Sequence, residues 1–361
     1  MKQYNAELTI GMDLGNKTCE ICILNTSDGS LIVRETVCSD IVSIKKYFSK
    51  FTNPMIVQIA LEAGTHSPWI YHLLKEMKFH VLVGHPRKLR AIWDNDNKND
   101  QKDAEMLARI ARFDTKLLSP IKHRSQSSHI DLSIIKCRDG LVSSRTNLVN
   151  MVRGLLKSQG INPPSCSTVC FPKNIYKILP EEVYSIFSEV LSAIDDITVK
   201  IHNLDKKIEK KCKEYNETES LRQIKGIGPV TSLSYILTLE NHNRFRKSRD
   251  VGAFLGLTPK RDQSGDIDKQ LGITKAGNRY LRKLLIGSAQ YILGPFGEDC
   301  DLRRYGLKIA ERGGKIAKRK AVVAVARKLA VLMHSLWRSG EDYNPLRKNK
   351  KITDVKLAEV A

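Results

Sequence analysis

Apolar residues in the first third of the chain form short runs. The first runs have the two-residue periodicity of strands, and the later ones alternate between helix and strand periodicity. Two or three runs rich in β-branched residues lie between residues 8 and 37, and Gly15-Asn16 and Ser27-Asp28-Gly29 separate them. This pattern predicts an antiparallel meander. Further along, the spacing predicts helices over 41–51, 68–77 and 101–113, with buried strands over 55–64 and 80–86. The order fits an α/β domain of the ribonuclease H type.

The middle of the chain has a helical periodicity instead. Leu141, Leu148, Val152 and Leu155 form one stripe, and an exposed loop is expected over 162–172. A second stripe has spacings close to three and four, which is typical of a coiled-coil seam. Its members are Ile186, Val190, Ile194, Ile197, Ile201, Leu204 and Ile208. The seam could pack as a hairpin within one chain or pair two protomers, and we favour pairing because a long apolar seam needs a partner.

The C-terminal third is predicted to be mainly helical. Lys225-Gly226-Ile227-Gly228 forms a tight turn before Pro229, as in a helix-hairpin-helix that holds a phosphate on free backbone N–H groups. Helices are expected over 251–259, 272–293 and 315–337, followed by a polar tail. The predicted fold class is therefore α/β plus all-α, with four parts: an α/β domain over 1–125, a helical and coiled-coil linker over 126–220, a C-terminal domain over 221–340 and a tail over 341–361.

Four carboxylates stand at the ends of predicted elements. Asp13 interrupts the apolar run of the first strand, Glu62 ends a buried strand, and Asp100 and Asp103 lie one turn apart at the start of a helix. Carboxylates gathered at one place repel one another unless cations lie between them. Oxygen ligands suit Mg²⁺ or Mn²⁺, and two such ions can stabilise the attacking and leaving oxygens of phosphoryl transfer. All four residues at these places favour a metal site.

Other interpretations of the acidic residues remain open. Asp13 and Glu62 could be ordinary strand-end residues, and Asp100 could be a helix N-cap. Asp94 and Asp96 compete as the third ligand, but their Asn-rich surroundings are typical of a loop. Glu105 is two residues beyond Asp103 on the same helix and should point away from the site.

A single serine, Ser264, lies in a short Gly-flanked turn, QSGD, among many basic residues. A hydroxyl among cations is suited to attack on a phosphodiester, because the cations stabilise charge that develops on the phosphate oxygens. A Ser-Gly turn is also common as a plain turn. The catalytic interpretation of Ser264 is favoured only because the chain also carries the separate set of carboxylates.

Charge indicates the partner. The formal net charge of the 361-residue chain is +21 and its pI is about 9.6, which is typical of proteins that bind a polyanion, nucleic acid first. No secretory signal or bilayer-spanning run is evident, and the eight cysteines lack paired ligand spacing, so a cytoplasmic protein with reduced thiols and no membrane partner is expected. Basic helices and turns supply the candidate nucleic-acid contacts. These are Arg138, Arg145, Arg153, Lys225, Gly226, Gly228, Lys260, Arg261, Lys275, Arg279 and Arg282.

The order and spacing of several motifs resemble those of insertion-sequence transposases with a RuvC-like domain and a C-terminal transposase domain, a family to which the Piv-type DNA invertases are related. The motifs are IGMDLGNKT, LEAG, NDQKDAEMLARI, GIGPVTS, FLGLTPKRDQSG and LGITKAGNRYLRKLL, and they span nearly the whole chain. The resemblance implies that Asp13, Glu62, Asp100 and Asp103 form a Mg²⁺-binding DEDD set. It implies that Ser264 is a nucleophile that links covalently to DNA, although the acidic run around it departs from the family's Gly- and Ser-rich pattern.

The resemblance also implies the partners. Members of that family assemble as homodimers into homotetramers, and their active sites combine the acidic set of one protomer with the serine of another. A non-coding bridge RNA pairs with donor and target DNA. A bacterial or archaeal protein associated with the nucleoid is expected. Three alternatives differ in mechanism: a RuvC-like junction nuclease in which Ser264 is only a turn residue, a Piv-type invertase without guide RNA, and a nucleic-acid-binding module without catalysis.

Overall fold

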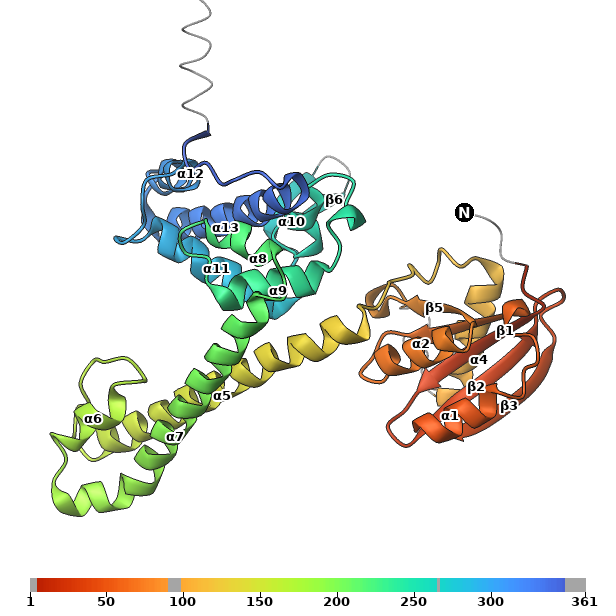
Figure 1. The fold of residues 1–361 in the computed structure, drawn as a ribbon, viewed down its shortest axis with the longest axis horizontal. Coiled ribbons are helices and arrows are strands. Elements are labelled where there is room, and N and C mark those ends of the chain that lie inside the picture. The colour runs from red at the N-terminus through yellow and green to blue at the C-terminus, as the bar shows by residue number, and fades with distance from the viewer. Residues whose placement is uncertain (1–4, 90–98, 265–266, 348–361) are drawn as a thin grey trace, which may run out of the picture. The chain divides into compact units, whose positions relative to one another are not determined.

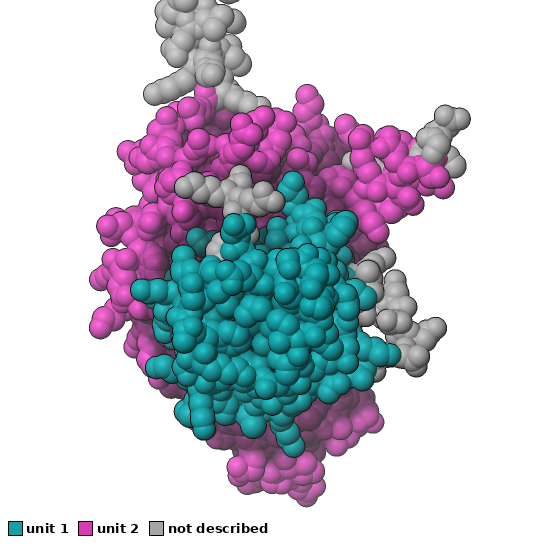
Figure 2. All heavy atoms as spheres, turned by 90° about the vertical axis from the view of Figure 1, so that its right-hand side faces the viewer, with its two compact units in different colours: residues 1–127 teal, residues 128–361 magenta. Residues whose placement is uncertain are grey.

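The computed structural model describes residues 5–89, 99–264 and 267–347. The chain divides into two compact units, Met1–Ser127 and Ser128–Ala361, which are coloured separately in Figure 2. The first unit is mixed α/β and the second is mostly helical (Figure 1). The finer division of the second unit into a linker, a C-terminal domain and a tail stays a prediction.

A five-stranded sheet forms the centre of the first unit. In the order β3-β2-β1-β4-β5, the strands β1, β2 and β3 are antiparallel, whereas β4 and β5 run parallel to β1. The strand bounds are Leu8–Leu14 (β1), Thr18–Asn25 (β2), Leu31–Cys38 (β3), Val57–Glu62 (β4) and His80–Gly84 (β5). The predicted meander and both later strands are confirmed.

Helices pack on both faces of this sheet, because successive side chains of a strand point to opposite faces and both faces carry apolar residues here. On one face Ile10 and Met12 pack in a core with α1 (Ile41–Phe48) and α2 (Ser67–Glu76). On the other face lies α4 (Asp100–Phe113), whose Ala104 and Ala108 pack on Cys22 and Leu24. The described part of the unit also contains two short 3₁₀ turns, Pro54–Ile56 and Pro86–Lys88.

The second unit begins with a helical hairpin. The long helices α5 (Gln126–Ser158) and α7 (Glu181–Cys212) run antiparallel, with the short α6 (Phe171–Tyr176) between them. Val152 packs near Ile194 at one end, and Ile135 packs near Ile208 at the other. Seam residues such as Ile194 and Ile208 are thus covered by α5 of the same chain. This arrangement corresponds to the hairpin alternative rather than to the favoured pairing of two protomers. Another seam residue, Ile186, is not covered in this way and is 68 % exposed.

The rest of the second unit is a helical cluster around one core, with a small β-hairpin. Its members are α8 (Glu217–Arg222), α9 (Pro229–Leu239), a 3₁₀ turn (His242–Arg244), α10 (Asp250–Phe254), β6 (Pro259–Ser264), β7 (Ile267–Ile273), α11 (Arg279–Leu293), α12 (Asp301–Ala310) and α13 (Gly314–Ser339).

One predicted helix in this region begins later than expected. The helix predicted over 272–293 starts at Arg279, because Asn278 caps it by accepting a hydrogen bond from the Leu281 N–H at 2.9 Å. The preceding residues 267–273 pair with β6 instead. All eight cysteines are free.

Candidate active site

Three of the four predicted carboxylates come together in the first unit. Asp13, Asp100 and Asp103 each offer an oxygen, and these oxygens all lie within 4.8 Å of one another. Asp13 lies near the carboxyl end of β1, and the other two lie in the first turn of α4, where the helix dipole favours negative charge. The donors are all carboxylate oxygens, which fits a hard divalent cation.

Contact between β1 and α4 places these carboxylates together. Gly11 lies two residues before Asp13 on the same face, and an added Cβ there would be 1.9 Å from the Ala104 carbonyl oxygen. Only glycine permits this approach. Gly11 was not among the predicted site residues, although a glycine inside an apolar strand is a signal for close backbone contact.

Polar contacts fix α4 on the sheet along its length. The buried Gln58 side chain donates a hydrogen bond to the Ala111 carbonyl at 3.1 Å, and Arg112 donates to the carbonyls of Thr26 and Ser27. Arg34 on β3 forms an ion pair with Glu105 on α4. The helix that carries Asp100 and Asp103 therefore has a defined position over β1.

Glu62 lies outside the group of three oxygens. It ends β4, whose Leu61 pairs with Met12 of the parallel β1, so Glu62 and Asp13 are at equivalent positions on neighbouring strands. Ala60, two residues earlier, packs with α4, so the pleat turns Glu62 to the face that carries Asp13. Glu62 is thus at the same level and face, without being in the cluster.

The other acidic candidates differ from these. Glu105 points away, as predicted, and forms ion pairs with Arg109 and Arg34. The hydrogen bond from Arg109, helped by Arg34, lowers the pKa of the Glu105 carboxyl. Asp94 and Asp96 lie outside the described residues.

Ser264, in the second unit, is the last residue of β6 and is exposed. It pairs with Ile267 across the β-hairpin, and the two residues between them lie outside the described part of the chain. The hairpin was not predicted as strands, because β6 is polar and exposed throughout and lacks an apolar alternation.

Two loops, one before β6 that contains Gly256 and one after β7 that contains Gly277, pack backbone to backbone at the base of this hairpin. Gly256 (φ +66°) would place a Cβ 2.2 Å from the Ala276 nitrogen, and Gly277 (φ +67°) would place one 2.1 Å from the Phe254 carbonyl oxygen. The half-buried Arg282 donates hydrogen bonds to the carbonyls of Leu255 and Ala276, at 2.9 and 2.6 Å. These contacts hold the two loops together and fix the stem on which Ser264 stands.

This contact gives a first prediction. Replacing Gly256 with Ala should lower the free energy of unfolding by at least about 2 kcal/mol, because Ala is strained at positive φ and its Cβ overlaps the Ala276 backbone. Thermal or urea unfolding measures the change. Gly272→Ala, on β7 with no atom near its Cβ position, is the matched control and should change stability little. If both variants lowered the free energy of unfolding equally, the close contact between Gly256 and Ala276 would not be the cause of the loss.

The α5 arginines all have intramolecular partners. Arg138 forms an ion pair with Asp205, and the buried Arg145 donates to the Thr198 hydroxyl, both partners lying on α7. Arg153 donates to the Cys166 carbonyl at 2.8 Å. These contacts hold the helical hairpin together. A role for these arginines in binding phosphate stays a prediction.

The remaining basic candidates differ in exposure. Lys260, Arg261, Lys275 and Arg279 are exposed. Lys275 lies in the loop before α11 rather than in the helix, with φ +54°. Arg282, in contrast, is committed to the two carbonyls at the hairpin stem. Arg261 forms an exposed ion pair with Asp268 at 3.5 Å, which contributes little energy, so all four side chains can still reach a phosphate.

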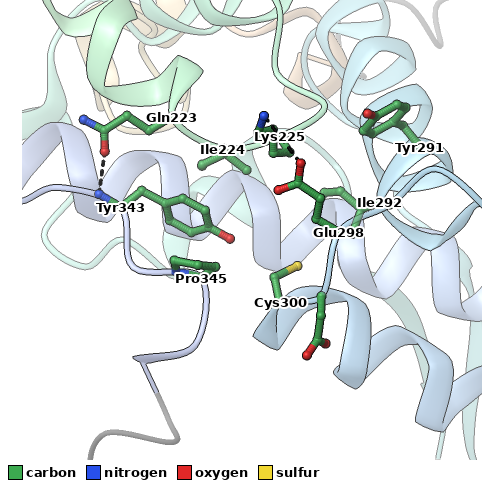
Figure 3. A pocket seen from close by; sticks show the side chains of 11 residues that line it. Gln223, Ile224, Lys225, Tyr291, Ile292, Glu298, Cys300, Tyr343 and Pro345 are labelled. Atoms are coloured by element: carbon green, nitrogen blue, oxygen red, sulfur yellow. Dashed lines mark hydrogen bonds and ion pairs between the residues drawn. The ribbon is translucent and has the colours of Figure 1, made fainter.

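The predicted turn before Pro229 connects α8 and α9. Gly226 has φ +93° and packs closely on Tyr291, while Gly228 is the N-cap of α9. Lys225 forms an exposed ion pair with Glu298 at 3.4 Å, which contributes little energy. Both residues of this ion pair line a cavity of about 180 Å³ (Figure 3).

The chain after α13 closes one side of this cavity. The Gln223 amide donates to the Asp342 carboxylate at 2.8 Å. Its oxygen accepts from the Tyr343 N–H at 2.6 Å, a bond that Figure 3 shows. The Asp301 N–H donates to the Pro345 carbonyl at 2.8 Å. Burial raises the pKa of Tyr343. Residues 342–345 of the predicted polar tail are therefore packed on the helical cluster.

Two family models match the chain. One, DEDD_Tnp_IS110, described as "Transposase", matches residues 10–161, and the other, described as "Transposase IS116/IS110/IS902 family", matches residues 218–296. The transposase for insertion sequence element IS1111A of Coxiella burnetii is 26 % identical over 343 residues, which cover 92 % of this chain and 90 % of the relative. The transposase for IS1328 of Yersinia enterocolitica is 23 % identical over 287 residues, 78 % of this chain and 82 % of the relative.

Together with the α/β domain and its carboxylate cluster, these matches define a DNA transposase. The chain belongs to the IS116/IS110/IS902 family of transposases. Its substrate is therefore DNA. Within the described residues, no helix is long and apolar enough to cross a bilayer.

Proposed function

We propose that this transposase cuts and rejoins DNA strands with a divalent metal held by Asp13, Glu62, Asp100 and Asp103 and with Ser264 as nucleophile. The observation that carries the proposal is the approach of three carboxylates, with oxygens within 4.8 Å of one another, on two elements far apart in sequence. Such a cluster of negative charge is costly without a cation. Mg²⁺ is the first candidate and Mn²⁺ the second, and either would neutralise charge on the phosphate oxygens.

The first unit supports this as a RuvC-like domain of the ribonuclease H type. A meander of three antiparallel strands is extended by two parallel strands, with helices on both faces. In this proposal Glu62 completes the set from β4. Its equivalent position beside Asp13 and its orientation toward the same face support that role.

Ser264 supplies the covalent step in this proposal. Its Oγ attacks the phosphorus of a DNA phosphodiester and loses its proton, a serine–phosphate ester forms, and the released strand ends in a hydroxyl. A strand hydroxyl then attacks the ester and restores the serine. One ester replaces another at each step, so rejoining needs no nucleotide hydrolysis. The exposure of Ser264 and the exposed Lys260 and Arg261 on the same strand support this role.

Target choice belongs to a bridge RNA in this proposal, since base pairing with donor and target DNA then reads the sequence. The protein would recognise backbone charge and shape, which agrees with its net charge of +21. We further propose a homodimer that assembles into a tetramer. Ile186, a member of the predicted seam on α7, is 68 % exposed, which leaves an apolar side chain available for a contact between protomers.

A covalent adduct tests the serine step. Full-length protein is incubated with Mg²⁺ and the DNA that flanks its gene, denatured and separated by size. The wild type should form a protein–DNA adduct whose digested peptide carries the nucleotide on Ser264, and Ser264→Ala should form none while it still binds DNA. RNA that purifies with the protein is sequenced in parallel.

Different outcomes favour different mechanisms. Cleavage by the wild type without an adduct would refute the serine step and favour a RuvC-like nuclease that uses water. A discrete RNA from the flank, with loops complementary to donor and target, supports guidance. Heterogeneous RNA together with active recombination would favour a Piv-type invertase mechanism.

A further inference from the structure

The last two helices of the helical cluster form a helix–turn–helix. α12 and α13 pack against each other and are joined by residues 311–313 (Figure 1). At their crossing, a Cβ on Gly306 would be 2.5 Å from a side-chain atom of Val325. The turn needs two glycines, since Gly313 and Gly314 have φ +81° and +73°. This segment lies outside the regions that the two family models match.

The first two turns of α13 are uncovered. From Ala321 onward the helix contributes to the core, with Val325 and Leu329 fully buried. Before that point, residues 314–320 are exposed except for Ala317, and Ile316 is 69 % exposed. The start of the second helix therefore projects from the cluster with side chains available on most of its circumference.

This projecting end is strongly basic. Lys315, Lys318 and Arg319 are spaced three and four residues apart, so they share one side of the helix. Further exposed cations nearby in the sequence are Lys308, Arg312 and Lys320, and Glu311 is the one acid from 308 to 320. Within the described residues none of these six cations has an ion-pair partner. Unpaired like charges held together favour a polyanionic partner.

We infer that the N-terminal turns of α13 dock in the major groove of duplex DNA. In a helix–turn–helix, residues at the start of the second helix enter this groove. An α-helix about 10–12 Å across fits the major groove of B-DNA, which is about 12 Å wide. The corresponding groove of A-form RNA is deep and narrow, so this shape favours DNA over a duplex RNA. The inference rests on the DNA substrate of the transposase and is independent of the metal and of Ser264.

The test compares two triple variants of the full-length protein. K315Q/K318Q/R319Q removes three cations from the projecting turns, and K206Q/K207Q/K210Q removes three cations from α7 as a matched control. Fluorescence anisotropy measures binding to a short mixed-sequence DNA duplex at several salt concentrations, with EDTA present so that no cleavage occurs. The same sequence as an RNA duplex is the competing probe.

We expect the affinity of the α13 variant for DNA to fall roughly tenfold or more at moderate salt. Its log–log salt slope should fall by about 2–3, because each phosphate that the protein no longer neutralises lowers the slope by about 0.9. The α7 variant should change much less, and both should melt at the wild-type temperature. An equal decrease in the two variants would refute a local docking site, as would an unchanged slope, and a larger decrease for RNA would refute DNA as the partner. Failure of the serine or metal chemistry would not alter this result.

Discussion

Asp13→Asn should abolish metal-dependent DNA cleavage, with a rate loss of at least about a thousandfold. A divalent cation contributes several kcal/mol to stabilising charge in phosphoryl transfer, and each 1.36 kcal/mol changes the rate about tenfold. Asp13 is the one member of the cluster on β1, whereas Asp100 and Asp103 both come from α4, so its loss removes the ligand that the strand supplies. Its amide would supply only a neutral oxygen to the cation.

Metal binding provides a readout that does not depend on DNA. Mg²⁺ or Mn²⁺ should raise the melting temperature of the wild type, because a ligand that binds only the folded state stabilises it. That rise should disappear in Asp13→Asn. Glu105→Gln removes a carboxylate from the same helix but from the side that faces Arg34 and Arg109, so it should keep the response to metal. Loss of the response in Glu105→Gln, or its survival in Asp13→Asn, would contradict the metal site.

Gly11→Ala should damage the site without touching a carboxylate. The new Cβ would lie 1.9 Å from the Ala104 carbonyl oxygen and 2.6 Å from the Ala108 nitrogen, both in the backbone of α4. The helix must move away from β1, which should cost about 1–3 kcal/mol of stability. A displacement near 1 Å at a reactive centre can reduce the rate about a hundredfold. We therefore expect both a lower unfolding free energy and a large loss of cleavage.

A helical glycine with open space supplies the control for this variant. Gly154 on α5 has no atom near its Cβ position, so Gly154→Ala should be neutral or stabilising by up to about 1 kcal/mol. Denaturant unfolding and a cleavage assay measure both variants. Full cleavage by a stably folded Gly11→Ala protein would show that the spacing of β1 and α4 does not set the geometry of the cluster.

Local periodicity was sufficient to predict the elements of the first unit. Strands such as β4 are mostly apolar runs between turn residues. α4 begins at Asp100, one residue before the predicted start, with its two aspartates one turn apart as predicted, and Asn99 rather than Asp100 is its N-cap. These features depend on neighbours a few residues away, which the sequence contains directly. The same reasoning failed for β6 and β7, because an exposed polar hairpin carries no apolar alternation.

The basic residues illustrate what the sequence could not distinguish. Arg145 and Lys315 both look like cations on a helix face, yet Arg145 is 8 % exposed and bonded to Thr198, while Lys315 is exposed. The difference depends on whether another helix covers that face. The covering helix for Arg145 is α7, about fifty residues further along the chain, and spacing along one helix contains no information about it.

The sequence by itself determined the element order of the first unit, the family resemblance and the candidate residues for the chemistry, since these depend on local pattern and motif spacing. The tertiary structure alone decided that Asp13 meets Asp100 and Asp103, and that Glu62 lies beside rather than within their cluster. It also decided which cations are exposed and which hold helices together. Each of these outcomes depends on packing between segments that are distant in sequence. Gly11 against Ala104 is an example: how closely the two backbones can approach determines where the side chains of β1 and α4 lie relative to one another.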